Sequence, residues 1–163
     1  MTSRKTTIAM FVAIAVAGSV FVSFPAGIAR AYPVQHTVNV LAAVMLGPGP
    51  AVLIAFLTGL VRVITGTGSL LAFPGSMIGA FLAGVLYKHY GKVWLAAVGE
   101  AIGTGILASF VAVPYAKILM GTSVTALFFM PVFLVSSVSG ALLGCIISVR
   151  LKETKFAHQL QKH

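Results

Sequence analysis

Acidic residues are almost absent from this sequence. Two of its 163 residues are acidic, Glu100 and Glu153, against eleven lysines and arginines. Charged residues of both signs make up 8% of the chain, whereas 59% of its residues are hydrophobic. A chain with so little charge cannot cover a soluble fold with polar surface. This shortage excludes an ordinary soluble domain and predicts an integral membrane protein.

The sequence also lacks the residues of several common sites. Its single cysteine, Cys145, cannot form an internal disulfide, and there is no H-E-x-x-H segment or cysteine cluster for a metal. No G-x-x-x-x-G-K-[ST] loop is present, so the chain does not hydrolyse nucleotide by that route. We therefore expect no metal and no other cofactor in this chain. We also expect no nucleic-acid partner, because the basic residues lie between and after apolar segments, where they act as topology signals and anchors to anionic lipid.

Apolar segments recur along the whole chain and predict an all-α bundle of six transmembrane helices in a single domain, residues 1–163. The second to fourth are short for a hydrocarbon core of about 30 Å, which leaves room for a cavity at one face. The first could instead be a signal peptide, but it is long enough to span the bilayer and further spans follow it. The predicted helices cover residues 8–24, 34–46, 51–65, 74–87, 93–113 and 125–149, and a basic tail covers 150–163.

The basic residues predict the orientation of the bundle. If both termini are cytoplasmic, eight of the eleven lie on the inner side: Arg4, Lys5, Lys88, Lys92, Arg150, Lys152, Lys155 and Lys162. The other three, Arg30, Arg62 and Lys117, lie outside or near the outer end of a helix. Because cytoplasmic loops of membrane proteins carry the excess of lysine and arginine, we expect both termini in the cytoplasm.

The segment from Arg62 to Ser76 predicts a binding pocket on the outer side. It combines an arginine, threonines, serines, glycines and a proline between two apolar helices. Backbone at membrane depth leaves helical geometry only where protein or a water-filled cavity satisfies its polar groups. The polar connections before the second helix and after the fifth fall on the same side. We therefore expect the pocket where these connections converge.

Ionisable and amide side chains inside the membrane are costly unless they are paired or hydrated, so they are candidates for the site. Arg62 and Glu100 either pair with each other, or one or both of them contact the substrate or tune its polar contacts. His36 and Asn39 lie three residues apart on one helix face, and Tyr32 before them offers an aromatic ring. The predicted substrate-binding residues are Tyr32, His36, Asn39, Arg62, Thr67, Ser69, Phe73, Ser76 and Glu100.

Small residues recur at four-residue spacing on four predicted helices. Such faces let helix backbones approach closely in lipid, either within one bundle or against another membrane subunit. The sets are Ala9, Ala13 and Ala17; Gly75, Gly79 and Ala83; Gly99 and Gly103; and Ser136, Gly140 and Gly144.

Several motifs resemble those of the ThiW family. They are PVQHTVNVLA from Pro33, LGP from Leu46, GTG from Gly66, LAFPGS from Leu71 and GEAIGTG from Gly99. The resemblance covers nearly the whole chain. It implies an S component, the substrate-binding subunit of an energy-coupling factor (ECF) transporter. Such a subunit is a six-helix, multi-pass protein of the bacterial or archaeal cell membrane.

The resemblance also implies a ligand and partners. The ligand is the thiazole moiety of thiamine, as hydroxyethylthiazole, captured at the extracellular face. The partners are a transmembrane T component and two ATPases, which use ATP for transport, and Ala9, Ala13 and Ala17 match the alanine motif that faces the T component. If the ligand is uncharged, Arg62 pairs with Glu100. Otherwise the ligand bears a phosphate or carboxylate.

Two other functions remain open on the residues alone. A self-sufficient secondary transporter of a small polar heterocycle would need inverted-repeat halves and a coupling-ion site, and no clear internal repeat is present. An intramembrane hydrolase could pair Ser76 with His36, but no motif of the rhomboid type surrounds Ser76. We therefore expect a binding subunit without enzymatic activity.

Overall fold

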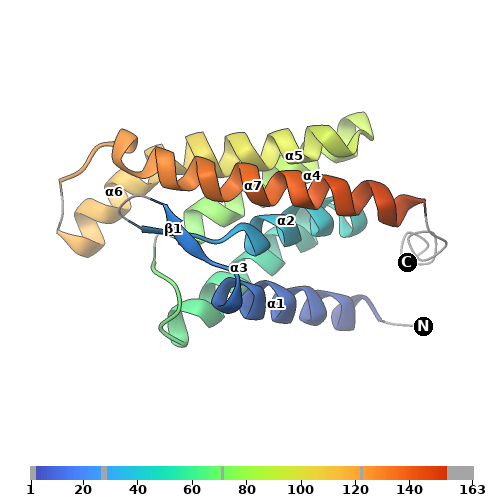
Figure 1. The fold of residues 1–163 in the computed structure, drawn as a ribbon, viewed down its shortest axis with the longest axis horizontal. Coiled ribbons are helices and arrows are strands. Elements are labelled where there is room, and N and C mark those ends of the chain that lie inside the picture. Colours follow the sequence, from blue (N-terminus) through green and yellow to red (C-terminus); the bar gives the residue numbers. More distant parts are fainter. Residues whose placement is uncertain (1–2, 27–28, 71, 122, 154–163) are drawn as a thin grey trace.

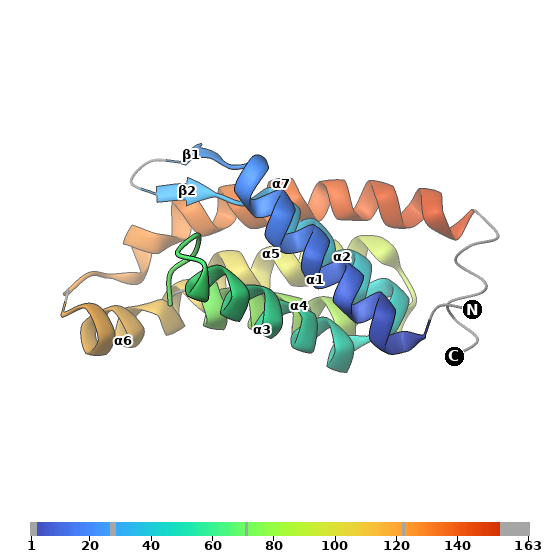
Figure 2. The same cartoon turned by 90° about the horizontal axis from the view of Figure 1, so that it is seen from below.

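The computed structural model describes residues 3–26, 29–70, 72–121 and 123–153. It is a bundle of long helices with a small hairpin at one end (Figures 1 and 2). The elements are α1 (Arg4–Phe21), β1 (Phe24–Ala26), β2 (Ala29–Ala31), α2 (Pro33–Leu46), α3 (Pro48–Ile64), α4 (Ala72–Tyr90), α5 (Val93–Ile102), the π-helical turn η1 (Gly103–Leu107), α6 (Ala108–Met120) and α7 (Ala126–Lys152).

The predicted helices are present, but several boundaries differ. α3 begins at Pro48 rather than at residue 51, and α7 continues to Lys152 rather than ending at residue 149. α1 begins earlier than predicted because the Ser3 side chain accepts a hydrogen bond from the backbone N–H of Thr6 and caps the helix. α4 is longer at both ends than the predicted 74–87. The fifth predicted helix does not stop at residue 113: Pro114 lies inside α6, and Gly121, with φ 65°, ends the helix.

The hairpin is the one departure from an all-α fold in the described residues. β1 and β2 pair antiparallel, with Phe24 opposite Ala31 and Pro25 opposite Arg30. The predicted first helix extended to residue 24. Because Pro25 lacks an N–H and disfavours a helical conformation in the residue before it, the chain is extended there instead. The hairpin leads into α2 beside the start of α7, where the backbone N–H of Tyr32 donates to Ser136 Oγ at 2.8 Å.

α2 lies at the centre of the bundle. It packs against α1, α3, α4, α5 and α7, and most of its residues are buried. Glycines allow close contacts between helices of the bundle. A Cβ at Gly140 of α7 would lie 2.2 Å from the carbonyl oxygen of Pro33 in α2, and one at Gly99 of α5 would lie 2.9 Å from the backbone of Ala83 in α4. The small-residue faces of α4, α5 and α7 therefore pack inside the bundle.

Three helices in the described part of the chain are long and apolar enough to cross a membrane: Arg4–Phe21, Val93–Ile118 (α5, η1 and α6 together) and Ala126–Lys152. Two shorter apolar helices, α2 and α3, lie with them. Large hydrophobic side chains are exposed on α1 and α7, among them Phe21, Leu142 and Ile146. An outer surface of this kind suits lipid rather than water.

Candidate functional site

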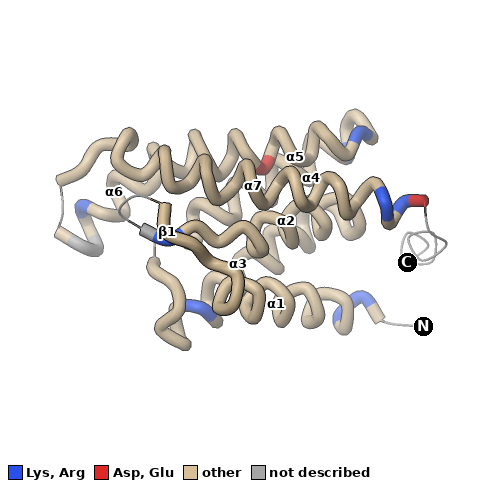
Figure 3. The backbone as a smooth tube through the Cα atoms, viewed as in Figure 1, with Lys and Arg blue, Asp and Glu red and all other residues tan. Residues whose placement is uncertain are grey.

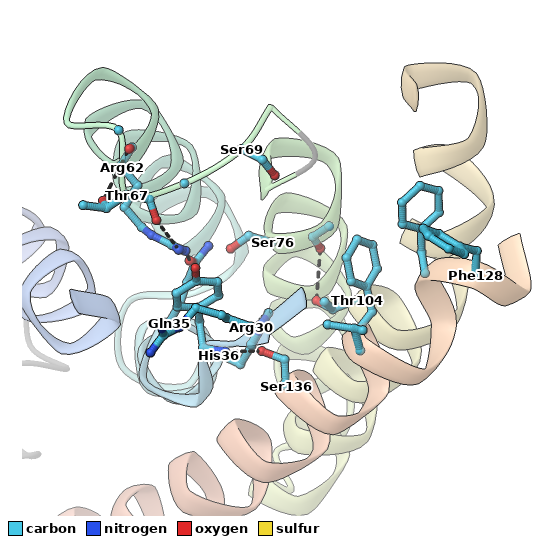
Figure 4. A pocket seen from close by; sticks show the side chains of 17 residues that line it. Arg30, Gln35, His36, Arg62, Thr67, Ser69, Ser76, Thr104, Phe128 and Ser136 are labelled. Carbon is cyan, nitrogen blue, oxygen red and sulfur yellow. Dashed lines mark hydrogen bonds between the residues drawn. The ribbon is translucent and has the colours of Figure 1, made fainter. Parts of the chain in front are cut away.

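A cavity of about 560 Å³ lies at the end of the bundle that carries the hairpin (Figure 4). Its walls come from β2, the start of α2, the end of α3 with the loop after it, the start of α4, η1 and the start of α7. This volume is within the usual range for small-molecule pockets. The lining residues are Arg30, Tyr32, Gln35, His36, Arg62, Gly66, Thr67, Gly68, Ser69, Gly75, Ser76, Thr104, Phe128, Phe129, Val132, Phe133 and Ser136.

Six of the nine predicted site residues line this cavity: Tyr32, His36, Arg62, Thr67, Ser69 and Ser76. Asn39 and Glu100 do not line it, but they bond to residues that do. Phe73 faces α3 instead, where its ring lies 5.6 Å from that of Phe56. Asn39, Glu100 and Phe73 are therefore not among the residues that line the cavity.

Glu100 is the centre of a buried hydrogen-bond network beneath the cavity. Its side chain is fully buried, and its Oε1 lies 2.7 Å from Nδ1 of His36 and 3.0 Å from both Asn39 Nδ2 and the Thr104 hydroxyl. Asn39 also donates to Ser76 Oγ at 3.0 Å. When Nδ1 of a neutral His36 donates to the carboxylate, its Nε2 is left as an acceptor. The network thus fixes the orientation of a ring that lines the cavity.

Two backbone features allow this network to form. Gly79 of α4 leaves room for it, since a Cβ there would lie 2.1 Å from Thr104 Oγ1 and 2.7 Å from Glu100 Oε2. Thr104 lies in the π-helical turn η1, one turn after Glu100. Such turns occur mostly within α-helices, and frequently at functional sites. Here the turn carries Thr104 to the cavity wall, where its hydroxyl also lies 3.0 Å from the carbonyl oxygen of Gly75.

Arg62 lies on the opposite wall and has different partners (Figure 4). It is 2% exposed. Its Nη1 donates to Gln35 Oε1, its Nη2 donates to the carbonyl oxygen of Thr67 at 3.0 Å, and its Cζ lies 3.9 Å from the centre of the Tyr32 ring. Arg62 thereby ties the loop after α3 to the start of α2.

The structure contradicts two sequence-based alternatives. Arg62 and Glu100 do not form a salt bridge in the described residues, because Glu100 is bonded to His36 and Arg62 to Gln35 and Thr67. The pairing expected for an uncharged ligand is therefore wrong. The Ser76–His36 pair of a hydrolase is not formed either: no hydrogen bond joins these two described residues, and Ser76 Oγ accepts from Asn39 instead.

Several lining residues were not among the predicted ones. Gln35 and Arg30 flank predicted residues in the sequence, so the polar character of that segment could have indicated them. Four residues of α7 form an apolar wall of the cavity. In the sequence, such residues cannot be distinguished from apolar residues that face lipid. They are Phe128, Phe129, Val132 and Phe133.

The cavity combines an aromatic wall with scattered hydrogen-bonding groups, which suits a small heterocyclic molecule. In the part of the chain that the structure describes, no three His, Cys, Asp or Glu side chains gather to hold a metal ion. The chain can therefore enclose and orient a small molecule with its own side chains.

Comparison with known proteins agrees with this description. Residues 6–154 match the family described as thiamine-precursor transporter protein (ThiW). Among curated proteins, none matches the chain. The family match covers most of the chain and includes every residue that lines the cavity. This membrane protein therefore belongs to the ThiW family of thiamine-precursor transporters.

Proposed function

We propose that this chain is the S component of an ECF importer and captures the thiazole moiety of thiamine, as hydroxyethylthiazole or a close derivative. The observation that carries the proposal is a partly polar, aromatic-walled cavity at one end of a bundle that belongs to a thiamine-precursor transporter family. The sequence has no phosphate-binding loop of its own. Energy for uptake would then come from two partner ATPases, joined through a T component.

The distribution of basic residues supports an extracellular cavity. Lysines and arginines gather at the end of the bundle where α1 begins and α7 ends, which is opposite the hairpin (Figure 3). Arg30 and Arg62, in contrast, lie at the cavity end. Under the positive-inside rule, the basic end faces the cytoplasm and the cavity faces outward. Of the tail predicted at 150–163, residues 154–163, with Lys155 and Lys162, lie outside the described residues.

The lining residues support a flat heterocycle as ligand. Phe128, Phe129 and Phe133 offer aromatic faces or edges to a thiazole ring. His36, held by Glu100, offers an acceptor to a hydroxyl group when it is neutral. A pocket with such an apolar wall and a few oriented polar groups discriminates between small ligands by their hydrogen-bonding groups.

A thermal-shift titration of the purified protein tests the ligand class. We expect stabilisation that rises with the concentration of thiazole compounds, because a ligand that binds only the folded state stabilises it by mass action. The pyrimidine moiety of thiamine serves as the comparison and should have a much smaller effect. Equal responses to the thiazole and the pyrimidine would contradict the proposal.

The alanines of α1 supply a surface for the T component. Ala9, Ala13 and Ala17 are all exposed, while Ala15 and Ser19 face the bundle. We expect Ala13→Trp to reduce co-purification with the T component and ATPases by about tenfold or more, because a bulky side chain prevents close helix approach. Ligand binding by the isolated subunit should remain.

Val138→Trp on α7 is a matched control, because Val138 is also an exposed apolar residue of a membrane helix. It should leave co-purification and uptake unchanged. Transport by this chain in the absence of any T component would instead indicate a self-sufficient carrier.

A further inference from the structure

The cavity contains two arginines and no carboxylate. The sequence has only two acidic residues, Glu100 and Glu153. Glu153 follows α7 at the opposite end of the bundle and lies 3.9 Å from Arg150. Glu100 does not line the cavity, and its Oε1 is hydrogen-bonded to His36, Asn39 and Thr104. Within the described residues, no carboxylate therefore contacts Arg30 or Arg62.

Arg62 is a buried cation whose partners in the described structure are all uncharged: an amide oxygen, a backbone carbonyl and an aromatic ring. Its Nε is buried and has no hydrogen-bond partner. A guanidinium has five N–H donors, and a buried charge is costly unless it is paired. Stable burial of Arg62 beside a cavity is thus readily explained if an anion occupies that cavity.

Arg30 provides a second positive charge on the same cavity from a different element, β2. It is exposed, and its Nε and Nη2 contact the hydroxyl and carbonyl oxygens of Ser23 at 3.1 and 3.3 Å. These partners are neutral as well. The loop after α3 adds two lining residues with hydroxyl groups, Thr67 and Ser69, of which Thr67 lies beside Arg62 (Figure 4). Two arginine forks with nearby hydroxyl groups are the donors that phosphate and carboxylate groups favour.

We propose that the ligand of this cavity carries an anionic group, a phosphate monoester or a carboxylate, which is bound by Arg30 and Arg62. This inference rests on the proposed function and specifies its substrate: the phosphorylated or carboxylated form of the thiazole is preferred over the neutral alcohol. The heterocycle then lies against the aromatic wall of α7. The anion neutralises Arg62, whose partners among the residues that the structure describes are all uncharged.

Calorimetric titration of the full-length protein in detergent tests the inference with four probes. They are hydroxyethylthiazole, its phosphate monoester, thiazole acetic acid and inorganic phosphate. We expect one of the two thiazole anions to bind at least about tenfold more tightly than the alcohol, since hydrogen bonds to charged groups are the stronger ones. We expect inorganic phosphate, which lacks the ring, to bind more weakly than the preferred anion.

Two variants test whether Arg30 and Arg62 cause the preference for the anionic ligand. Arg30→Gln removes an exposed charge from the cavity and should reduce the preference for the anion over the alcohol about tenfold. Arg62→Lys keeps the charge but removes the bidentate fork, and should also reduce the preference. Lys117→Gln is the matched control: it removes a basic residue that does not line the cavity, and the preference should persist.

The outcomes separate this inference from the proposed function. Equal affinity for the alcohol and both thiazole anions would overturn the anion site and leave thiazole capture standing. Inorganic phosphate that binds as tightly as the phosphate ester would keep the anion site and overturn the thiazole as ligand. No binding of any probe would overturn both. An anion preference that survives Arg30→Gln and Arg62→Lys would overturn the assignment to these residues.

Discussion

Replacing Glu100 with alanine is expected to lower the free energy of unfolding by about 3–5 kcal/mol, because it deprives buried hydrogen-bond donors of their acceptor at about 1–3 kcal/mol each. The carboxylate accepts from three side chains of different elements: His36 and Asn39 of α2 and Thr104 of η1. Without it, three buried polar groups lose an acceptor, and no water is present at membrane depth to replace it. The ring of His36 also loses its orientation, so ligand affinity should fall as well.

The free energy of unfolding is measured by titrating the detergent-solubilised protein with SDS. Glu153→Ala is the matched control, because Glu153 is the other acid and is exposed. Its effect should stay within about 0.5 kcal/mol. Glu100→Gln keeps one carbonyl oxygen for the network and should have an intermediate effect. If Glu100→Ala were as stable as the original protein, the network would not contribute to folding.

Gly140→Ala is expected to destabilise the bundle by about 1–3 kcal/mol. An alanine normally favours a helix over glycine by up to about 1 kcal/mol. Here the sign reverses because the added Cβ would lie 2.2 Å from the carbonyl oxygen of Pro33 and 2.6 Å from Cβ of His36. Backbone cannot move aside as a flexible side chain can, so the start of α2 must shift away from α7. Because that start carries Gln35 and His36, ligand binding should weaken together with stability.

The control for this variant is Gly49→Ala in the first turn of α3. A Cβ at Gly49 meets nothing within 4 Å, so this substitution should leave stability unchanged or slightly higher. Thermal unfolding and ligand titration of both variants give the comparison. Equal stability of the two alanine variants would contradict the close packing of α2 against α7.

Local sequence signals were sufficient for the helices and for the position of the pocket. Apolar runs separated by Gly and Pro predict membrane helices because the bilayer requires each helix to satisfy its own backbone. The polar break between Arg62 and Ser76 likewise predicts a cavity, since that backbone needs polar surroundings. His36 and Asn39 share a helix face through their spacing alone. These inferences depend on neighbours in the sequence, which is why they could be made without coordinates.

Contacts between distant residues could not be predicted in the same way. Nothing in the sequence indicates that Glu100 bonds to His36, 64 residues away, rather than to Arg62. The choice depends on how α2, α4 and α5 pack, and Gly79 decides it by leaving room for the carboxylate at α4. Likewise, which face of α7 is turned toward the cavity depends on its contact with α2 at Gly140.

The sequence by itself thus determined that this is a helical membrane protein of the ThiW family with a polar pocket at one end. Only the tertiary structure separated its two intramembrane charges. Glu100 lies in a buried hydrogen-bond network beneath the cavity, and Arg62 lies on the wall with neutral partners. The physical reason is that the cost of burying a charge depends on its neighbours in space, and close helix packing, rather than sequence spacing, selects those neighbours.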